Sequence, residues 1–216
     1  MSDIKNILFD WDGTLAYTLN LWLTSYQKTF MDNGVEVSDK DIPKILQRKG
    51  HKQLINAIEP DKRDEFYNNV DSTAVTLVPN TVKLYPNARE SVTKLHAKDK
   101  KLGIVTNSDS NFIGECLKSL NLEAYFDVVI TSDMLTVKKP DPEGLLLAVK
   151  MLSANKDETV YIGDMVSDIE AAKAAGIKSV LYYPEENHYY YAKDEFESSK
   201  PDFIIKDLIE TVDLFT

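Results

Sequence analysis

The chain has 216 residues, of which 43% are hydrophobic, which is enough for one sizeable domain or for a core with an insertion. Its formal net charge is −10 and no basic stripe offsets it, which argues against a protein that binds nucleic-acid phosphates. No apolar run approaches the roughly 18 residues of a membrane span. The first residues lack a signal-peptide pattern, so we expect a cytoplasmic protein without membrane partners. Its single cysteine, Cys116, is then expected to be a buried apolar residue.

The first predicted element is a buried strand over residues 4–9, and two carboxylates follow it directly. Asp10 and Asp12 stand two residues apart, just before the turn residue Gly13. Buried carboxylates are costly unless they are paired, hydrogen-bonded or bound to a metal. We therefore expect a cation to meet them. The alternative is a plain turn stabilised by an aspartate side chain.

The next stretch, as far as about Lys83, contains no convincing strand. Its apolar spacing predicts helices over residues 17–31, 41–46, 52–58 and 61–77, the last of which stops before Pro79. Trp22 and Tyr26 lie one turn apart on the first of these helices, where they either line a substrate pocket or pack the helices together. We predict that residues 16–83 form an all-helical insertion and that residues 1–15 and 84–216 form the domain that it interrupts.

Strands and helices then alternate to the end of the chain. Strands are predicted over residues 102–106, 128–131, 160–163, 180–183 and, more weakly, 203–205, and helices over residues 87–98, 110–120, 142–152 and 167–175. Short, almost continuously apolar strands separated by helices indicate a parallel sheet that is covered by helices on both faces. The predicted fold class is therefore α/β.

Polar residues follow four of the predicted strands. They are, in chain order, Asp10 and Asp12; Thr106, Asn107 and Ser108; Lys138 and Lys139; and Asp164 and Asp168. Because ligands of open parallel sheets bind beyond the carboxyl ends of the strands, we expect these residues to meet in one site. Taken singly, each has an ordinary alternative. Residues 106–108 could cap a helix, Lys139 could be solvated, and Asp164 and Asp168 could serve a helix dipole.

The expected site has the composition of a phosphate and metal site. An oxygen-rich carboxylate cluster suits Mg²⁺, with Asp10 and Asp164 as the best candidate ligands. Asp168 lies four residues after Asp164, on the same face of a helix start, as a further ligand or a supporting residue. Lys139 offers a positive charge to a phosphate or to Asp10, while Thr106 and neighbouring backbone amides can cradle phosphate oxygens.

These parts together predict a reaction at phosphorus. A carboxylate beside a metal and a cation can attack phosphorus and form a covalent aspartyl-phosphate. Asp12 can then act as general acid and base, first for the leaving oxygen and later for water. The three histidines, His51, His96 and His188, are scattered and are not expected to take part.

Four motifs resemble the signature motifs of the haloacid dehalogenase-like hydrolase superfamily. They read DWDGTL at Asp10–Leu15, TNS at Thr106–Ser108, KPDP at Lys139–Pro142 and GDMVSD at Gly163–Asp168. The alanine-rich continuation of the last motif as far as Gly176 resembles the phosphoglycolate-phosphatase branch. The resemblance implies a Rossmann-like core, a helical cap at residues 16–83 and a Mg²⁺ cofactor.

The resemblance also implies a role for each site residue. Asp10 is the nucleophile and a metal ligand, and Asp12 is the acid and base that also lends its backbone carbonyl to the metal. Asp164 binds the metal with Asp168 in support. The phosphate is held by Thr106, the amide of Asn107 and Lys139.

Some residues discriminate between branches of the superfamily. True dehalogenases replace the second aspartate, so Asp12 favours a phosphate ester as substrate. The β-phosphoglucomutase branch usually has a histidine after the first motif and Glu-Asp in the fourth, whereas residues 16–30 contain no histidine and Gly163 precedes Asp164. We predict a phosphatase acting on a small phosphorylated metabolite. A phosphomutase of the β-phosphoglucomutase type and a non-catalytic binding protein on the same scaffold are the alternatives.

The residues that select the substrate are not readable. The polar stretch 48–52 could meet an anionic substrate or form a solvated loop. A Schiff-base lysine, as in the phosphonatase branch, would have to be Lys28, Lys49 or Lys52, and no pattern marks any of them as buried. The sequence gives no indication of the oligomeric state.

Overall fold

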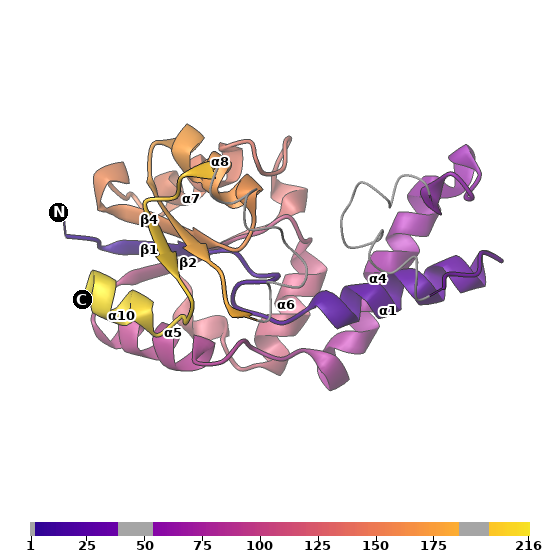
Figure 1. Ribbon diagram of the computed structural model, residues 1–216, viewed down its shortest axis with the longest axis horizontal. Coiled ribbons are helices and arrows are strands. Elements are labelled where there is room, and N and C mark those ends of the chain that lie inside the picture. The colour runs from indigo at the N-terminus through magenta and orange to yellow at the C-terminus, as the bar shows by residue number, and fades with distance from the viewer. Residues whose placement is uncertain (1–2, 39–53, 186–198) are drawn as a thin grey trace. The chain divides into compact units, whose positions relative to one another are not determined.

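A computed structural model of the chain describes residues 3–38, 54–185 and 199–216 (Figure 1). The chain divides into two compact units, one formed by Met1–Tyr17 with Lys83–Thr216 and the other by Thr18–Val82. We call them the sheet unit and the helical unit. Within the described residues, no helix combines the length and hydropathy needed to cross a bilayer.

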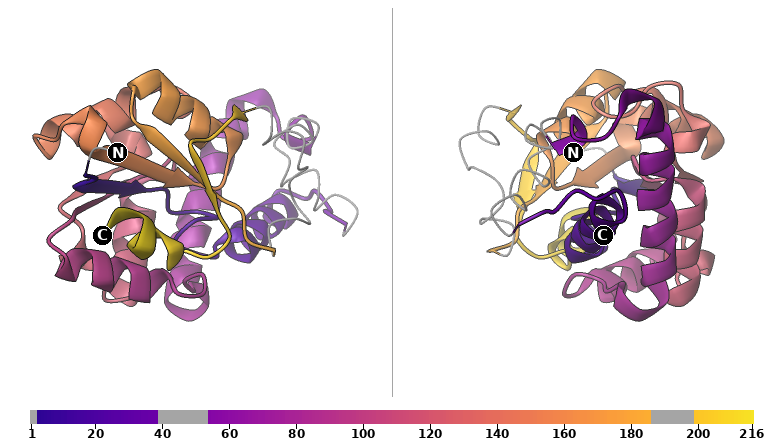
Figure 2. Two further views of the ribbon diagram at one scale, coloured as in Figure 1. Left: turned by 60° about the vertical axis from the view of Figure 1, so that its left-hand side comes forward. Right: turned by 90° about the vertical axis from the view of Figure 1, so that its right-hand side faces the viewer.

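The sheet unit is built on six parallel strands in the order β3-β2-β1-β4-β5-β6 (Figures 1 and 2). The strands are β1 (Asn6–Phe9), β2 (Lys101–Val105), β3 (Val128–Ile130), β4 (Thr159–Gly163), β5 (Lys178–Tyr182) and β6 (Phe203–Ile205). After β1 the chain builds the sheet outward on one side, and after β3 it returns to build the other side. The direction therefore switches beside β1, which is the usual place for a ligand site in such sheets.

Helices cover both faces of this sheet. They are α5 (Ala88–Ala97), α6 (Ser110–Ser119), α7 (Glu143–Met151), α8 (Val166–Ala175) and α10 (Glu210–Phe215), with 3₁₀ turns at Glu123–Tyr125, Ser132–Met134 and Lys156–Glu158. Helices α7 and α8 pack on one face, while α5 and α10 pack together on the other (Figure 1). The predicted α/β class, with helices flanking a parallel sheet, is confirmed.

The core of the sheet unit explains why these segments are strands. All four residues of β1 are buried, and Leu8 pairs with Gly103 of β2 and Tyr161 of β4. Leu8, Val105 and Tyr161 belong to one apolar cluster that continues into α7 and α8. A strand that is buried on both faces needs an almost continuous apolar sequence, which is what β1 provides. Cys116 of α6 is buried, as expected.

Element boundaries differ from the predicted ones by one or two residues in most places. Helix α7 begins at Glu143, with Pro142 just before it. The short helix α10 was not predicted, because six residues give too little periodicity to separate a helix from a loop.

The helical unit contains α1 (Leu19–Asp32), a 3₁₀ turn at Pro60–Lys62 and α4 (Arg63–Thr81). Phe30 of α1 meets Phe66 of α4, with ring centroids 4.7 Å apart. Trp22 and Tyr26 pack against the same apolar cluster, which favours packing over the pocket-lining alternative. The helix predicted at residues 41–46 lies outside the described residues, and the one at 52–58 lies partly outside them.

The prediction that the last helix of this unit stops before Pro79 is wrong. Helix α4 continues through Pro79 to Thr81. A proline lacks the N–H that would bond to the carbonyl four residues earlier, and its ring crowds that carbonyl. Pro79 lies within the last turn of α4, so the loss is confined to the frayed end of the helix.

The two connections to the helical unit leave the sheet unit side by side. Ala16 forms an antiparallel bridge with Leu84. The amide of Tyr17 donates to the carbonyl of Lys83 at 2.8 Å, and the amide of Tyr85 donates to the carbonyl of Leu15 at 3.0 Å. A short ladder thus closes the sheet unit at the point where the chain departs and returns.

Candidate active site

The site lies at the carboxyl ends of three neighbouring strands. Asp10 follows β1, Thr106 follows β2 and Asp164 follows β4, and β1 pairs with both of the other strands. The amide of Asp10 still donates to the carbonyl of Ile162 at 2.8 Å, so the sheet ladder fixes its backbone. The expectation that these residues meet at one edge of the sheet agrees with the fold.

Lys139 is the cation that meets Asp10. Its Nζ lies 2.8 Å from Oδ1 of Asp10, and both side chains are buried, at 4% and 8% exposure. The backbone amide of Trp11 also donates to Oδ1, at 2.8 Å. Two donors on one oxygen fix the orientation of the Asp10 carboxylate. The alternative of a solvated Lys139 is wrong.

Asp168 joins the same lysine to the start of α8. Its Oδ1 lies 2.7 Å from Nζ of Lys139, and its Oδ2 accepts from the amide of Met165 at 2.9 Å. Asp168 therefore lies in the first turn of α8, as the helix-dipole alternative held, accepts from a backbone amide there, and also pairs with Lys139. A Cβ at Gly163 would lie 2.4 Å from Cγ of Asp168, so this close packing requires a glycine.

Asp164 lies in the turn between β4 and α8, not on the helix, because α8 begins only at Val166. The hydroxyl of Thr14 donates to its Oδ1 at 3.1 Å. Gly13 has a φ of 82°, and a Cβ there would lie 2.3 Å from Oδ2 of Asp164. The first motif thus needs its glycine both for the backbone conformation and for room beside this carboxylate.

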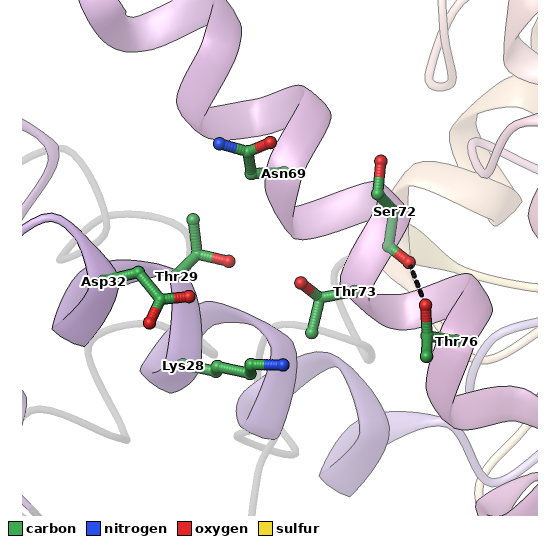
Figure 3. A pocket seen from close by; sticks show the side chains of 7 residues that line it. All are labelled: Lys28, Thr29, Asp32, Asn69, Ser72, Thr73 and Thr76. Carbon is green, nitrogen blue, oxygen red and sulfur yellow. Dashed lines mark hydrogen bonds between the residues drawn. The ribbon is translucent and has the colours of Figure 1, made fainter.

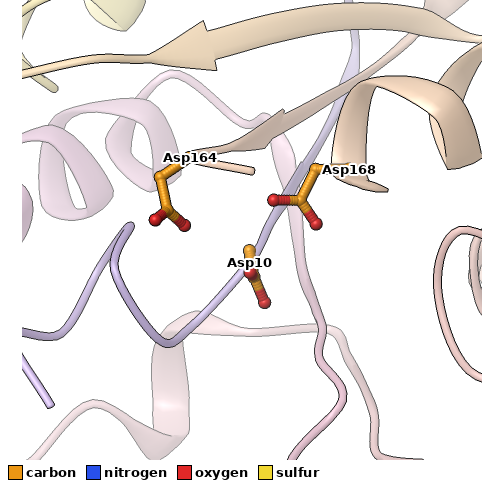
Figure 4. A group of neighbouring side chains, drawn as sticks. All are labelled: Asp10, Asp164 and Asp168. Carbon is orange, nitrogen blue, oxygen red and sulfur yellow. The ribbon is translucent and has the colours of Figure 1, made fainter. Parts of the chain in front are cut away.

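Three buried carboxylates form the centre of the site (Figure 4). Asp10, Asp164 and Asp168 each offer an oxygen, and these oxygens lie within 4.8 Å of one another. Three carboxylates face one ammonium, that of Lys139, so two negative charges remain when all are ionised. A donor set of oxygens alone with this excess charge fits a hard divalent cation.

Burial of these charged side chains shifts their pKa values. Burial raises the pKa of Asp10 to about 7, against the opposing charge of Lys139. Burial, and then the charges of Asp168 and Asp10, raises the pKa of Asp164 well above its ordinary value. Burial alone would lower the pKa of Lys139, but the charges of Asp10 and Asp168 raise it overall. A bound cation would favour the ionised carboxylates.

Asp12 lies in a different environment from Asp10. It is half-buried, and its Oδ2 accepts a hydrogen bond from the hydroxyl of Ser108 at 2.7 Å. Its side chain is not among the three clustered carboxylates. The two aspartates of the first motif therefore lie in different environments, although they are only two residues apart in the sequence.

The loop after β2 connects the parts of the site. Thr106 is buried, and its Oγ1 accepts from the amide of Ser108 at 3.1 Å. The side-chain oxygen of Asn107 accepts from the amide of Lys139 at 3.0 Å, which ties the lysine loop to this strand end. Helix α6 is capped by Asp109, so the alternative that residues 106–108 are its cap is wrong.

Sequence reasoning missed two participants. Tyr161, in the middle of β4, accepts from Nζ of Lys139 at 2.7 Å and donates to the carbonyl of Val105 at 2.7 Å. Ser108 belongs to one of the four motifs, but no sequence pattern indicates its bond to Asp12. The sequence feature that could have indicated Tyr161 is its hydroxyl, because its neighbours Val160 and Ile162 in the strand are apolar.

The helical unit holds a polar pocket of about 330 Å³ between α1 and α4 (Figure 3). Its lining includes Lys28 and Asp32 on α1 and Asn69, Ser72, Thr73 and Thr76 on α4. Lys28 is exposed, so it lacks the burial that is expected of a Schiff-base lysine. Two other predicted features lie outside the described residues. They are the stretch 48–52, which includes Lys49, His51 and Lys52, and the residue His188. His96 stacks edge-on against Tyr125, on the surface of the sheet unit.

Comparison with known proteins agrees with this geometry. A pyrophosphatase named PpaX from Listeria monocytogenes is 33% identical in an alignment 191 positions long, and the match covers 84% of this chain and 87% of that protein. A phosphoglycolate phosphatase from Salmonella typhi is 29% identical in an alignment 220 positions long, and the match covers 83% of this chain and 81% of that protein. A crystal structure of a haloacid dehalogenase-like hydrolase from Bacteroides fragilis superposes with a TM-score of 0.83 at 26% identity, over 96% of this chain and 99% of that one.

A family model points the same way. The model described as haloacid dehalogenase-like hydrolase matches residues 7–182, which include all four motifs and the three clustered carboxylates. The chain therefore belongs to the haloacid dehalogenase-like hydrolases.

Proposed function

We propose that this hydrolase is a Mg²⁺-dependent phosphatase that cleaves a small phosphorylated metabolite through an aspartyl-phosphate on Asp10. One observation carries the proposal: the buried carboxylate of Asp10 pairs with the ammonium of Lys139 at 2.8 Å and has an oxygen within 4.8 Å of one from Asp164. The names of the two relatives, a pyrophosphatase and a phosphoglycolate phosphatase, support the phosphate chemistry.

Asp10, Asp164 and the backbone carbonyl of Asp12 would hold the Mg²⁺, with Asp168 in support through Lys139. The bound ion would supply positive charge for the phosphate oxygens and keep the carboxylates ionised. Asp168 already uses one oxygen for Lys139 and the other for the amide of Met165, which favours support over direct ligation.

Asp10 is the proposed nucleophile. Its Oδ1 is held by Lys139 and Trp11, so the carboxylate is oriented before the substrate arrives. An oxygen of Asp10 forms the bond to phosphorus while the bond from phosphorus to the leaving oxygen breaks. Lys139 favours the charged form of the nucleophile, against the burial that disfavours it.

Asp12 is the proposed acid and base. It gives its proton to the leaving oxygen in the first step. It then takes a proton from the water that attacks phosphorus, which frees Asp10 and releases inorganic phosphate. Its half-buried position and its bond from Ser108 suit a group that must exchange protons, whereas Asp10 is enclosed.

The remaining predicted site residues would bind the phosphate. The hydroxyl of Thr106, the amide of Asn107 and the ammonium of Lys139 are proposed to contact its oxygens. The helical region, residues 16–83, is proposed to act as the cap that selects the leaving group.

A phosphate-release screen tests the proposal. Purified protein with Mg²⁺ is offered phosphoglycolate, pyrophosphate, sugar phosphates and nucleotides, and Asp10→Asn serves as the inactive control. We expect release from at least one small substrate, and its loss in the control. Isomerised sugar phosphate in a coupled assay would indicate the phosphomutase instead, and a flat screen with tight ligand binding would indicate the binding protein.

A further inference from the structure

Lys139 has no spare hydrogen-bond donor. A lysine ammonium carries three N–H groups and accepts nothing. Its Nζ lies 2.8 Å from Oδ1 of Asp10, 2.7 Å from Oδ1 of Asp168 and 2.7 Å from the hydroxyl of Tyr161. Three acceptors therefore match three donors, and a phosphate oxygen can reach this ammonium as an acceptor only if one of the three bonds is given up.

The three bonds are not equally easy to give up. The ammonium makes all three bonds charge-assisted, but Asp10 and Asp168 also carry the opposite charge, so they attract Lys139 more strongly than an uncharged acceptor does. Tyr161 is the single uncharged acceptor of the three. The pKa of its hydroxyl is raised by burial and then by the negative charges of Asp10 and Asp168, so it stays neutral.

Tyr161 is also placed to lose this bond at small cost. Its hydroxyl donates to the carbonyl of Val105 at 2.7 Å, and that bond does not involve Lys139. The ring is 1% exposed and belongs to the apolar cluster shared with Leu8 and Val105, so packing holds it in place. The hydroxyl therefore keeps a partner when the lysine turns away.

We propose that Tyr161 is a positioning residue that holds the third N–H of Lys139 until a phosphate oxygen replaces it. The inference rests on the proposed function, because it takes phosphate as the ligand of Lys139. The bond to Tyr161 keeps the ammonium satisfied in the free enzyme, and binding exchanges one neutral acceptor for a charged one. The hydroxyl thus competes with phosphate.

This competition predicts that a variant binds phosphate more tightly than the wild type. In Tyr161→Phe the ring still fills the core, but the free enzyme has lost an acceptor for Lys139. Since a net hydrogen bond contributes about 1 kcal/mol, the dissociation constant of phosphate should fall about three- to tenfold. A hydroxyl that only braces the core would leave this constant unchanged in the folded protein.

The experiment is calorimetric titration of inorganic phosphate into the Mg²⁺-loaded wild type, Tyr161→Phe and Tyr182→Phe. Tyr182 is the matched control, a buried tyrosine on the neighbouring strand β5 that packs edge-on against Tyr85. We expect tighter binding in Tyr161→Phe alone. Unchanged or weaker binding in that variant, or the same change in Tyr182→Phe, overturns the inference.

A second measurement uses the wild type, in case Tyr161→Phe does not fold. With ¹³C at tyrosine Cζ, phosphate should shift the Tyr161 resonance, identified by its proximity to the Val105 backbone, and the absence of a shift overturns the inference. The two proposals fail differently. A wild type that releases phosphate from esters but shows no effect of Tyr161 refutes this inference alone. A wild type that neither binds nor releases phosphate refutes both.

Discussion

The two units of the chain hold their polar side chains in opposite ways. In the sheet unit, Lys139 is buried and joins Asp10, which follows β1, to Asp168 on α8. In the helical unit, Lys28 and Asp32 are exposed beside the polar pocket. Hydroxyls on α4 such as that of Thr76 bond to the backbone of their own helix. The fold therefore fixes the groups of the sheet unit, while those of the helical unit remain adaptable.

From this difference we expect the fixed groups of the sheet unit to carry out the reaction and the adaptable groups of the helical unit to select the substrate. Groups that must attack phosphorus need an orientation fixed before the substrate arrives. Groups that choose between leaving groups can be solvated and can vary. We therefore expect large effects from substitutions in the sheet unit and small effects from the same substitutions in the helical unit.

The largest contrast is expected between Asp10→Asn and Asp32→Asn. An amide is a poor nucleophile, so Asp10→Asn should lower kcat by on the order of 10⁴-fold. The exposed Asp32 should tolerate the change with kcat within about twofold. Steady-state phosphate release with Mg²⁺ measures both, and circular dichroism controls for folding. Similar losses of kcat in the two variants would contradict the expected difference between the sheet unit and the helical unit.

A second contrast compares two lysines. Lys139→Met leaves Asp10 and Asp168 buried without their cation, which should cost about 3–5 kcal/mol of unfolding free energy. Lys28→Met on α1 should change it by less than about 0.5 kcal/mol. Urea unfolding of the metal-free proteins gives both values. A loss below about 1 kcal/mol for Lys139→Met would mean that the buried ion pairs do not hold the site together.

The third prediction concerns metal and pH. The folded-state pKa of Asp10 is raised to about 7, above its unfolded value near 4, so its contribution to stability falls as pH rises between these values. Mg²⁺ requires the ionised form and should reverse this trend. We expect Mg²⁺ to raise the unfolding temperature more at pH 8 than at pH 5.5.

Two variants serve as controls for that experiment. Asp164→Asn should lose the Mg²⁺-induced shift, because an amide replaces a proposed metal ligand. Asp32→Asn should keep it. An equal shift at both pH values, or one that survives in Asp164→Asn, would place the metal elsewhere.

The smallest effect is expected at Ser108. Ser108→Ala removes the 2.7 Å bond to Asp12 and should lower the rate for alkyl phosphates about fivefold, because the proposed acid is less well oriented. Aryl phosphates with good leaving groups need less protonation and should lose less. Ser72→Ala in the helical unit is the control, with both rates unchanged. Equal losses for the two ester classes in Ser108→Ala would remove the positioning role of Ser108.

Much of the sheet unit could be predicted, because the apolar pattern of each segment and the order of strands and helices along the chain indicate the same parallel sheet. The strand before Asp10 is continuously apolar, and each later polar motif follows a similar strand. A parallel sheet brings such strand ends to one edge, so the proximity of Asp10 and Asp164 followed from topology alone. The end of α8 at Gly176, where φ is 74°, was equally readable.

The parts that could not be predicted depend on three-dimensional contacts. The bond from Tyr161 to Lys139 joins residues 22 apart, and no spacing rule connects a strand interior to a loop lysine. Helix α4 runs through Pro79 because the proline lies in its last turn, where little is lost, and the exact end of a helix is not readable from the sequence. In the helical unit, amphipathic spacing indicated helices but not which polar groups would share a pocket.

The most direct test of the central claim is to trap the phosphorylated enzyme. Wild-type protein is mixed with a substrate found in the screen and Mg²⁺, quenched within one turnover, and treated with borohydride, which reduces an acyl phosphate to an alcohol. Peptide mass spectrometry should then find homoserine in place of Asp10 and unmodified Asp12. Modification at another residue, or phosphate release without any trapped Asp10, would contradict the account.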